Sequence, residues 1–193
     1  MEFSFIKILE IIGLISGVLY VILASRENIW CWPIGILGSI ASMIVTWESK
    51  LYLDVGLFGY YVLIGFYGWY LWRKGKQVQK TLTISQISVK LLLMLLGLGV
   101  LFTIGLGQLF SIYTDASIPY WDAFTTGFSL VATYMQAKKF LENWLLWIVV
   151  DAIYVGVYFY KDLDFFAILS IFYTIMAVYG FIHWRKTYQS ATP

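Results

Sequence analysis

Charged side chains are scarce in this sequence, and their scarcity excludes most classes of soluble protein. Only 12% of the 193 residues are Asp, Glu, Lys or Arg, and 61% are hydrophobic, whereas about a quarter of the residues of a soluble domain are charged. A chain of this composition cannot cover its surface with polar groups in water, so we expect an integral membrane protein. The apolar runs are far longer than barrel strands, which favours spanning helices.

Cysteine and histidine occur once each, as Cys31 and His183. A single cysteine excludes an internal disulfide framework, and no cluster of His, Cys and carboxylate residues indicates a metal site. His183 lies beside Trp184 and basic residues at the end of the last apolar run, which is typical of the membrane interface. We therefore expect no catalytic residue, metal, cofactor or nucleic-acid partner, and an enzyme is a remote alternative.

Seven apolar segments approach the length of about 20 residues that a spanning helix needs. They cover residues 8–25, 29–47, 55–72, 91–112, 120–137, 143–160 and 165–183. The connections between them are short, except for the polar and basic segment 73–90. The predicted fold class is an all-α integral membrane protein with seven transmembrane helices.

The chain also contains an internal repeat with an offset of 112 residues. Residues 13–74 align without a gap with 125–186, where 11 of 62 positions are identical and both copies close on Trp-Arg-Lys. This predicts two parallel three-helix repeats joined by a linker helix, an architecture found in transporters. The expected parts are a first repeat (8–72), a basic cytoplasmic loop with the linker helix (73–112), a second repeat (120–186) and a C-terminal tail (187–193).

Basic residues predict the orientation in the membrane, because cytoplasmic loops carry an excess of Lys and Arg. With the N-terminus outside, ten of the 13 basic residues fall on the cytoplasmic side and only Lys7, Lys50 and Lys161 fall outside. The sequence thus predicts an external N-terminus and a cytoplasmic C-terminus.

One carboxylate, Asp151, stands in the middle of the apolar segment 143–160. A charge at the bilayer centre costs roughly 2.5–3.5 kcal/mol on insertion scales, so it should face protein or water. Asp151 lies on a helix face of about 80° that also carries two indoles and two phenols. The residues of this face are Trp144, Trp147, Asp151, Tyr154 and Tyr158.

Two further spans carry polar faces made of small or hydroxylic side chains. They are Trp32, Gly35, Ser39, Ser42 and Thr46 in the second span, and Thr126, Ser129, Thr133 and Gln136 in the fifth. Indole faces and a carboxylate attract cations, and hydroxyls suit a sugar or an amide. The sequence therefore predicts a pocket for a flat organic cation, with substrate contacts from Trp144, Trp147, Asp151, Tyr154, Ser39, Ser42, Thr126, Ser129 and Thr133.

Each of these residues also has a purely structural interpretation. Trp and Tyr near helix ends are often interfacial anchors, and Ser and Thr inside spans often bond their own helix or a neighbouring one. Asp151 could instead pair for structure or couple transport to protons. A non-transporting membrane scaffold is a further alternative, although it would need no inward polar face.

Three stretches resemble the PnuC family of bacterial vitamin transporters, which take up nicotinamide riboside. They are "NIWCWPIG" (28–35), "LYLDVGLFGYYVLIGFYGW" (51–69) and "DAFTTGFSLVATYMQAKKFLENWLLWIVVDAIYVGVYFYK" (122–161). The last contains the family pattern W-x-x-W-x-x-x-[ND] as Trp144, Trp147 and Asp151. The resemblance covers nearly the whole chain and is more specific than general hydrophobicity.

The resemblance implies a fold like that of the SWEET sugar transporters, with the substrate between the two repeats at the midplane. It also implies a homotrimer in the bacterial inner membrane and uptake by facilitated diffusion, with intracellular phosphorylation trapping the vitamin. Trp144, Trp147 and Asp151 carry over as substrate contacts. Phe58 stands where family members commonly have Gln. Thiamine, carried by related subfamilies, remains an alternative substrate, as do another vitamin, a nucleoside or a sugar. The "WPIG" stretch (32–35) favours nicotinamide riboside.

Overall fold

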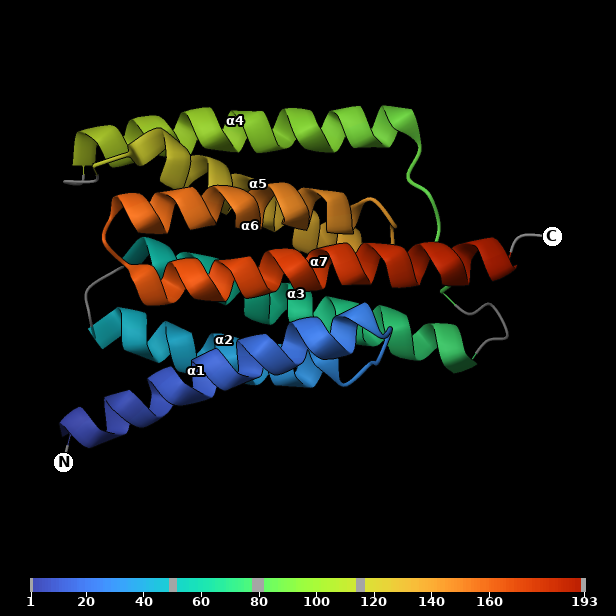
Figure 1. The fold of residues 1–193 in the computed structure, drawn as a ribbon, viewed down its shortest axis with the longest axis horizontal. Helices are drawn as coiled ribbons and strands as arrows, with labels where there is room; N and C mark the ends of the chain where they lie inside the picture. The colour runs from blue at the N-terminus through green and yellow to red at the C-terminus, as the bar shows by residue number, and fades with distance from the viewer. Residues whose placement is uncertain (1, 49–51, 78–81, 114–116, 192–193) are drawn as a thin grey trace. The chain divides into compact units, whose positions relative to one another are not determined.

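Seven α-helices make up most of the residues that the computed structural model describes, which are 2–48, 52–77, 82–113 and 117–191 (Figure 1). In chain order they are α1 (Glu2–Ser25), α2 (Cys31–Glu48), α3 (Tyr52–Gln77), α4 (Val89–Tyr113), α5 (Pro119–Ala137), α6 (Asn143–Tyr160) and α7 (Asp164–Ala191). The predicted fold class, an all-α membrane protein with seven helices, is confirmed.

Some helices are longer than the apolar runs that predicted them. α3 continues to Gln77 and α7 to Ala191, beyond the basic residues at which the apolar runs end. A helix continues while its backbone hydrogen bonds do, whereas hydropathy falls at the first charges. Within the described residues, α1, α2, α4, α6 and α7 are long and apolar enough to cross a membrane. α3 and α5 carry more polar or charged side chains, including the Ser, Thr and Gln residues of the predicted α5 face.

The chain divides into two compact units, residues 1–83 and 84–193. In the first unit α2 packs against both α1 and α3. In the second unit α6 packs against both α5 and α7, and α4 lies along α5 (Figure 1). In each unit the second helix of the predicted repeat thus contacts both of the others, and the linker helix α4 belongs to the second unit.

Small residues allow α4 and α5 to approach closely. A Cβ atom at Gly99 of α4 would lie 3.1 Å from the Phe128 ring of α5, and one at Gly127 of α5 would lie 3.2 Å from the Gly99 carbonyl oxygen. Such contacts between glycine and a facing helix are how membrane helices gain packing energy where lipid supplies no hydrophobic drive. This packing fixes the back of α5, so that its opposite side is free to face α6.

The two repeats turn the chain in the same way between their first and second helices. Glu27 after α1 and Lys139 after α5, which are 112 residues apart, both have positive φ, at 55° and 57°. In each turn the next residue donates its N–H to the carbonyl five residues earlier, at 2.9 Å from Asn28 and 3.0 Å from Phe140. The two turns that correspond at the 112-residue offset thus have the same local geometry.

The segment before α4 is bound to the turn between α5 and α6. Ser85 donates its N–H to the Lys139 carbonyl at 3.1 Å and accepts the Leu141 N–H at 2.9 Å. The N–H of Ile87 donates to Glu142 Oε2 at 3.1 Å. These bonds hold the turn that precedes α6 and thereby fix where the polar face of α6 begins.

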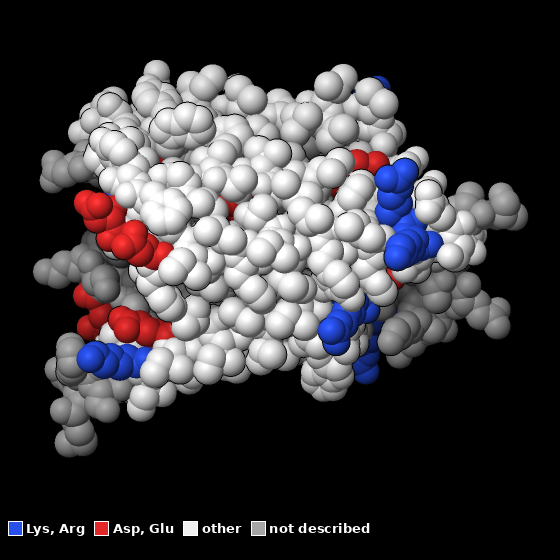
Figure 2. Space-filling model, viewed as in Figure 1, with Lys and Arg blue, Asp and Glu red and all other residues white. Residues whose placement is uncertain are grey.

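Apart from Asp151 in the middle of α6, most charges lie toward the helix ends of each unit, and the face drawn in Figure 2 is almost uncharged between them. In the first unit the end formed by the end of α1, the start of α2 and the end of α3 is basic, with Arg26, Arg73 and Lys74. In the second unit the corresponding end carries Lys90, Lys138, Lys139, Arg185 and Lys186, and the other end carries Asp122, Lys161, Asp162 and Asp164. Each unit thus shows by itself the asymmetry on which the predicted orientation rests.

Candidate substrate site

The polar face of α6 points into the second unit. Trp144 and Asp151 are 1% and 7% exposed, whereas Leu145 and Val149 on the other side of the helix are 44% and 48% exposed. Trp147, which lies between Trp144 and Asp151 in the chain, is half-buried. Helical periodicity therefore separates an inward face of indole and carboxylate from an outward apolar face, as lipid outside and a polar interior require.

Asp151 is the central group of this face. It is buried, and within the described residues no hydrogen bond or ion pair is formed to its carboxylate. Tyr173 of α7 lies near enough to Asp151 to interact with its charge. A buried carboxylate without a cation is costly, so this position is suited to a ligand that brings a positive charge.

Trp147 lies one turn before Asp151 and is held from α5. Its indole Nε1–H donates to the side-chain oxygen of Gln136 at 3.2 Å. Gln136 is 1% exposed, and its Nε2 has no hydrogen-bond partner among the described residues. Gln136 was part of the polar face read from α5 but was not among the predicted substrate contacts. Its spacing from Ser129 and Thr133 is the signal that could have included it.

Trp144 has a different environment from Trp147. A Cβ atom at Gly180 of α7 would lie 2.7 Å from the Trp144 ring, and the Trp184 ring meets it edge-on at a centroid distance of 5.4 Å. Its Nε1–H has no partner among the described residues. Trp144 is thus packed between α6 and α7, which is a structural role whether or not one edge of its ring reaches a ligand.

The hydroxyl residues of α5 divide into two kinds. Thr133 is buried and donates its hydroxyl to the Ser129 carbonyl at 2.7 Å, so it satisfies its own helix. Ser129 is also buried, and Thr126 is half-buried. The structure therefore supports the structural interpretation for the Thr133 hydroxyl and leaves Thr126 and Ser129 as candidates.

The remaining predicted contacts lie at the end of α6 and in the first unit. Tyr154 stacks on Tyr158 with their rings 5.4 Å apart and nearly parallel. Ser39 and Ser42 are half-buried on α2 in the first unit, where a Cβ atom at Gly13 would lie 2.8 Å from Ser42 Oγ. Ser42 thus packs on α1. The structure brings Trp147, Gln136 and Asp151 together in one unit and places the two serines in the other.

The chain resembles known transporters over nearly its whole length. The sequence model of the nicotinamide mononucleotide transporter family matches residues 7–186. The nicotinamide riboside transporter PnuC of Escherichia coli is 25% identical, over 91% of this chain and 84% of that protein. PnuC of Neisseria mucosa is 25% identical, over 91% and 71%. The riboflavin/roseoflavin transporter RibM of Streptomyces davaonensis is 24% identical, over 91% and 83%.

A solved structure has the same fold. The crystal structure of the vitamin B3 transporter PnuC matches with a TM-score of 0.74, covering 98% of this chain and 91% of that one, at 21% sequence identity. The seven-helix arrangement is therefore shared with a vitamin transporter.

Proposed function

Because the chain belongs to the nicotinamide mononucleotide transporter family, in agreement with its PnuC-like motifs, we propose that it takes up nicotinamide riboside by facilitated diffusion. It is a multi-pass membrane protein, and its relatives are bacterial transporters. Its place is the inner membrane, with the N-terminus outside and the C-terminus in the cytoplasm, in keeping with the basic ends of both units. A homotrimer is part of the same proposal, on the PnuC resemblance alone.

The assignment of the substrate rests on Asp151, which is unpaired and buried beside Trp147. Nicotinamide riboside has a flat pyridinium cation, which an indole face attracts by about 0.5–2 kcal/mol or more when desolvated. Charge pairing with Asp151 would offset the cost of burying both ions. The substrate cation is then the partner that the carboxylate lacks within the described residues.

The charge of Asp151 distinguishes this substrate from the others that the relatives and the family suggest. Nicotinamide mononucleotide adds a phosphate and is net negative, so a buried carboxylate opposes it. Riboflavin is neutral and gains nothing from a carboxylate. Thiamine is an aromatic cation and remains the second candidate, because Asp151 and Trp147 suit it equally.

The rest of the site follows from the two repeats. The proposed substrate contacts in the second unit are Trp144, Trp147, Asp151 and Tyr154 of α6 and Thr126, Ser129 and Thr133 of α5. Those proposed in the first unit are Ser39 and Ser42 of α2. Thr133 would contribute only as a hydrogen-bond acceptor, because its proton is used within α5. No second carboxylate stands in the middle of a predicted span beside Asp151, which favours downhill transport without ion coupling.

Titration calorimetry on purified protein tests the proposal. The unaltered protein is expected to bind nicotinamide riboside more tightly than nicotinamide mononucleotide or riboflavin, with thiamine as the critical comparison. Asp151→Asn should weaken binding moderately, because shape and hydrogen-bonding capacity survive. Asp151→Leu should weaken it by at least about a factor of 30, which corresponds to roughly 2 kcal/mol.

The matched control is Val149→Ala on the outward face of the same helix, which should leave the affinity unchanged. If Asp151→Leu binds nicotinamide riboside as tightly as the unaltered protein, Asp151 is a structural residue and the proposed site is wrong. Tighter binding of thiamine than of nicotinamide riboside by the unaltered protein would reassign the substrate.

A further inference from the structure

The hydrogen bond between Trp147 and Gln136 determines which half of the Gln136 amide is left over. An indole N–H can only donate, so the group facing Trp147 Nε1 has to be the amide oxygen. The distance of 3.2 Å agrees with that bond. The amide N–H₂ of Gln136 therefore keeps two donors that this contact cannot use.

These two donors are buried, and a buried polar group needs a hydrogen-bond partner. Gln136 is 1% exposed, and its Nε2 has no partner among the described residues. A buried amide nitrogen that makes no hydrogen bond costs about 1–3 kcal/mol in proteins. In the first repeat the corresponding residue is Ala24, which is fully buried. The fold of a repeat thus needs no amide here, and the one in the second repeat calls for another reason.

From this, and resting on the function proposed above, we propose that Gln136 recognises the substrate by donating an amide N–H to the carboxamide oxygen of nicotinamide riboside. The amide nitrogen is held at the edge of the Trp147 indole, because the oxygen of the same group is bonded to that edge. In this proposal, a flat cation stacked on the indole would bring its carboxamide to this edge. Gln136 would then select for an acceptor on the ring, while Asp151 responds to the charge.

A hydrogen-bond donor at Gln136 would distinguish ligands that are equal in charge and in stacking surface. N-ribosylpyridinium keeps the cation and the ribose but lacks the carboxamide. The unaltered protein should bind nicotinamide riboside about ten times more tightly than N-ribosylpyridinium, which is the effect of losing one buried hydrogen bond. Equal affinities would overturn the assignment without any variant having to fold.

Gln136→Met supplies the second arm, because Met has a similar length and flexibility and lacks the amide. It should lower the affinity for nicotinamide riboside about tenfold and the affinity for N-ribosylpyridinium by less than about twofold. The matched control is Thr125→Val in the same helix, whose buried hydroxyl bonds the Trp121 and Asp122 carbonyls. That variant should bind both ligands as the unaltered protein does.

The outcomes distinguish the two proposals. If the unaltered protein binds neither ligand, the proposed function is wrong and this inference fails with it. If it binds nicotinamide riboside and Gln136→Met does so equally well, only the role of Gln136 is wrong. If Gln136→Met weakens both ligands by the same factor, Gln136 merely orients Trp147, and recognition of the carboxamide is refuted.

Discussion

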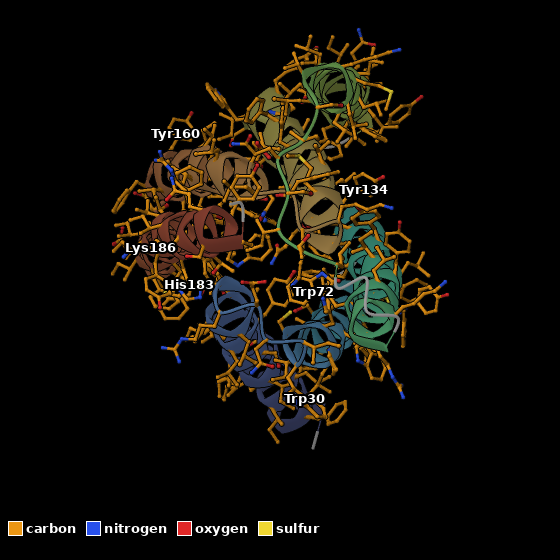
Figure 3. The ribbon with its side chains drawn as sticks, turned by 90° about the vertical axis from the view of Figure 1, so that its right-hand side faces the viewer. Trp30, Trp72, Tyr134, Tyr160, His183 and Lys186 are labelled. Atoms are coloured by element: carbon orange, nitrogen blue, oxygen red, sulfur yellow. The ribbon has the colours of Figure 1, made fainter. Side chains whose placement is uncertain are left out.

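In the first repeat the Trp32 ring meets Trp72 edge-on at 5.5 Å, and in the second Trp144 meets Trp184 edge-on at 5.4 Å. Both first members lie against a glycine of the third helix, where a Cβ atom at Gly68 or Gly180 would collide with the indole. Figure 3 shows Trp72 on the inner side of its bundle, whereas Trp30 lies at the outer edge. The two repeats therefore share one way of packing their helices.

The same repeats differ where the site is proposed. Gly35 of the first repeat corresponds to Trp147, and a Cβ atom at Gly35 would lie 2.7 Å from the Tyr20 ring. An aromatic ring thus comes from the first helix in one repeat and from the second helix in the other, where Ala132 corresponds to Tyr20. Ser39 corresponds to Asp151. The comparison indicates that packing is common to both repeats, while the indole and the carboxylate of the proposed site are present in the second repeat and replaced by Gly35 and Ser39 in the first.

The largest expected effect concerns the shared packing. Trp32→Ala and Trp144→Ala should each destabilise the protein by about 3–5 kcal/mol, as large-to-small changes at buried aromatic sites do. Because the two surroundings match, the loss of thermal stability should be similar, measured as the midpoint of size-exclusion recovery after heating. An unchanged midpoint for Trp144→Ala would show that the indole is not a packing residue and would break the comparison.

A smaller effect is expected where the repeats differ. Trp147→Ala should remove the stacking surface and reduce affinity for nicotinamide riboside by about a factor of 5–30, or roughly 1–2 kcal/mol. In the fraction of protein that remains folded, Trp144→Ala should reduce the affinity for nicotinamide riboside by a smaller factor, because the Trp144 ring packs against α7. Titration calorimetry on monodisperse protein gives both values. A larger loss at Trp144 than at Trp147 would reverse the roles assigned to the two indoles.

The smallest effect is expected at the acidic end of the second unit. Lys161 Nζ lies 2.8 Å from Asp122 Oδ1, with side chains 28% and 24% exposed. Such partly exposed pairs contribute about 0–1 kcal/mol, so Lys161→Ala should lower the thermal midpoint by no more than a degree or two, with no change in substrate affinity. In the first repeat the position of Lys161 is taken by Ser49, so the cation of this pair is not encoded there. A large fall in stability would mean that the bridge is a structural difference between the repeats.

The periodicity of side chains along one helix is a local property. The sequence was therefore sufficient to predict features that depend on a single helix. Apolar length predicted seven helices, the 112-residue offset predicted the repeat, and the spacing of Trp147 and Asp151 placed them on one face. The prediction of a shared face rests on the constant angle by which an α-helix turns per residue, whatever its neighbours are. The charge asymmetry of the helix ends is equally a property of the sequence.

Which neighbour each face meets was decided only by the tertiary structure. Trp144 and Trp147 look alike in sequence, yet one packs on Gly180 and the other bonds Gln136. Thr133 and Gln136 stand on the same face of α5, yet the Thr133 hydroxyl returns to its own backbone. Spacing along a helix gives the direction of a side chain but not the atoms opposite it. Those atoms depend on how α5, α6 and α7 cross, and so on contacts between residues far apart in the chain.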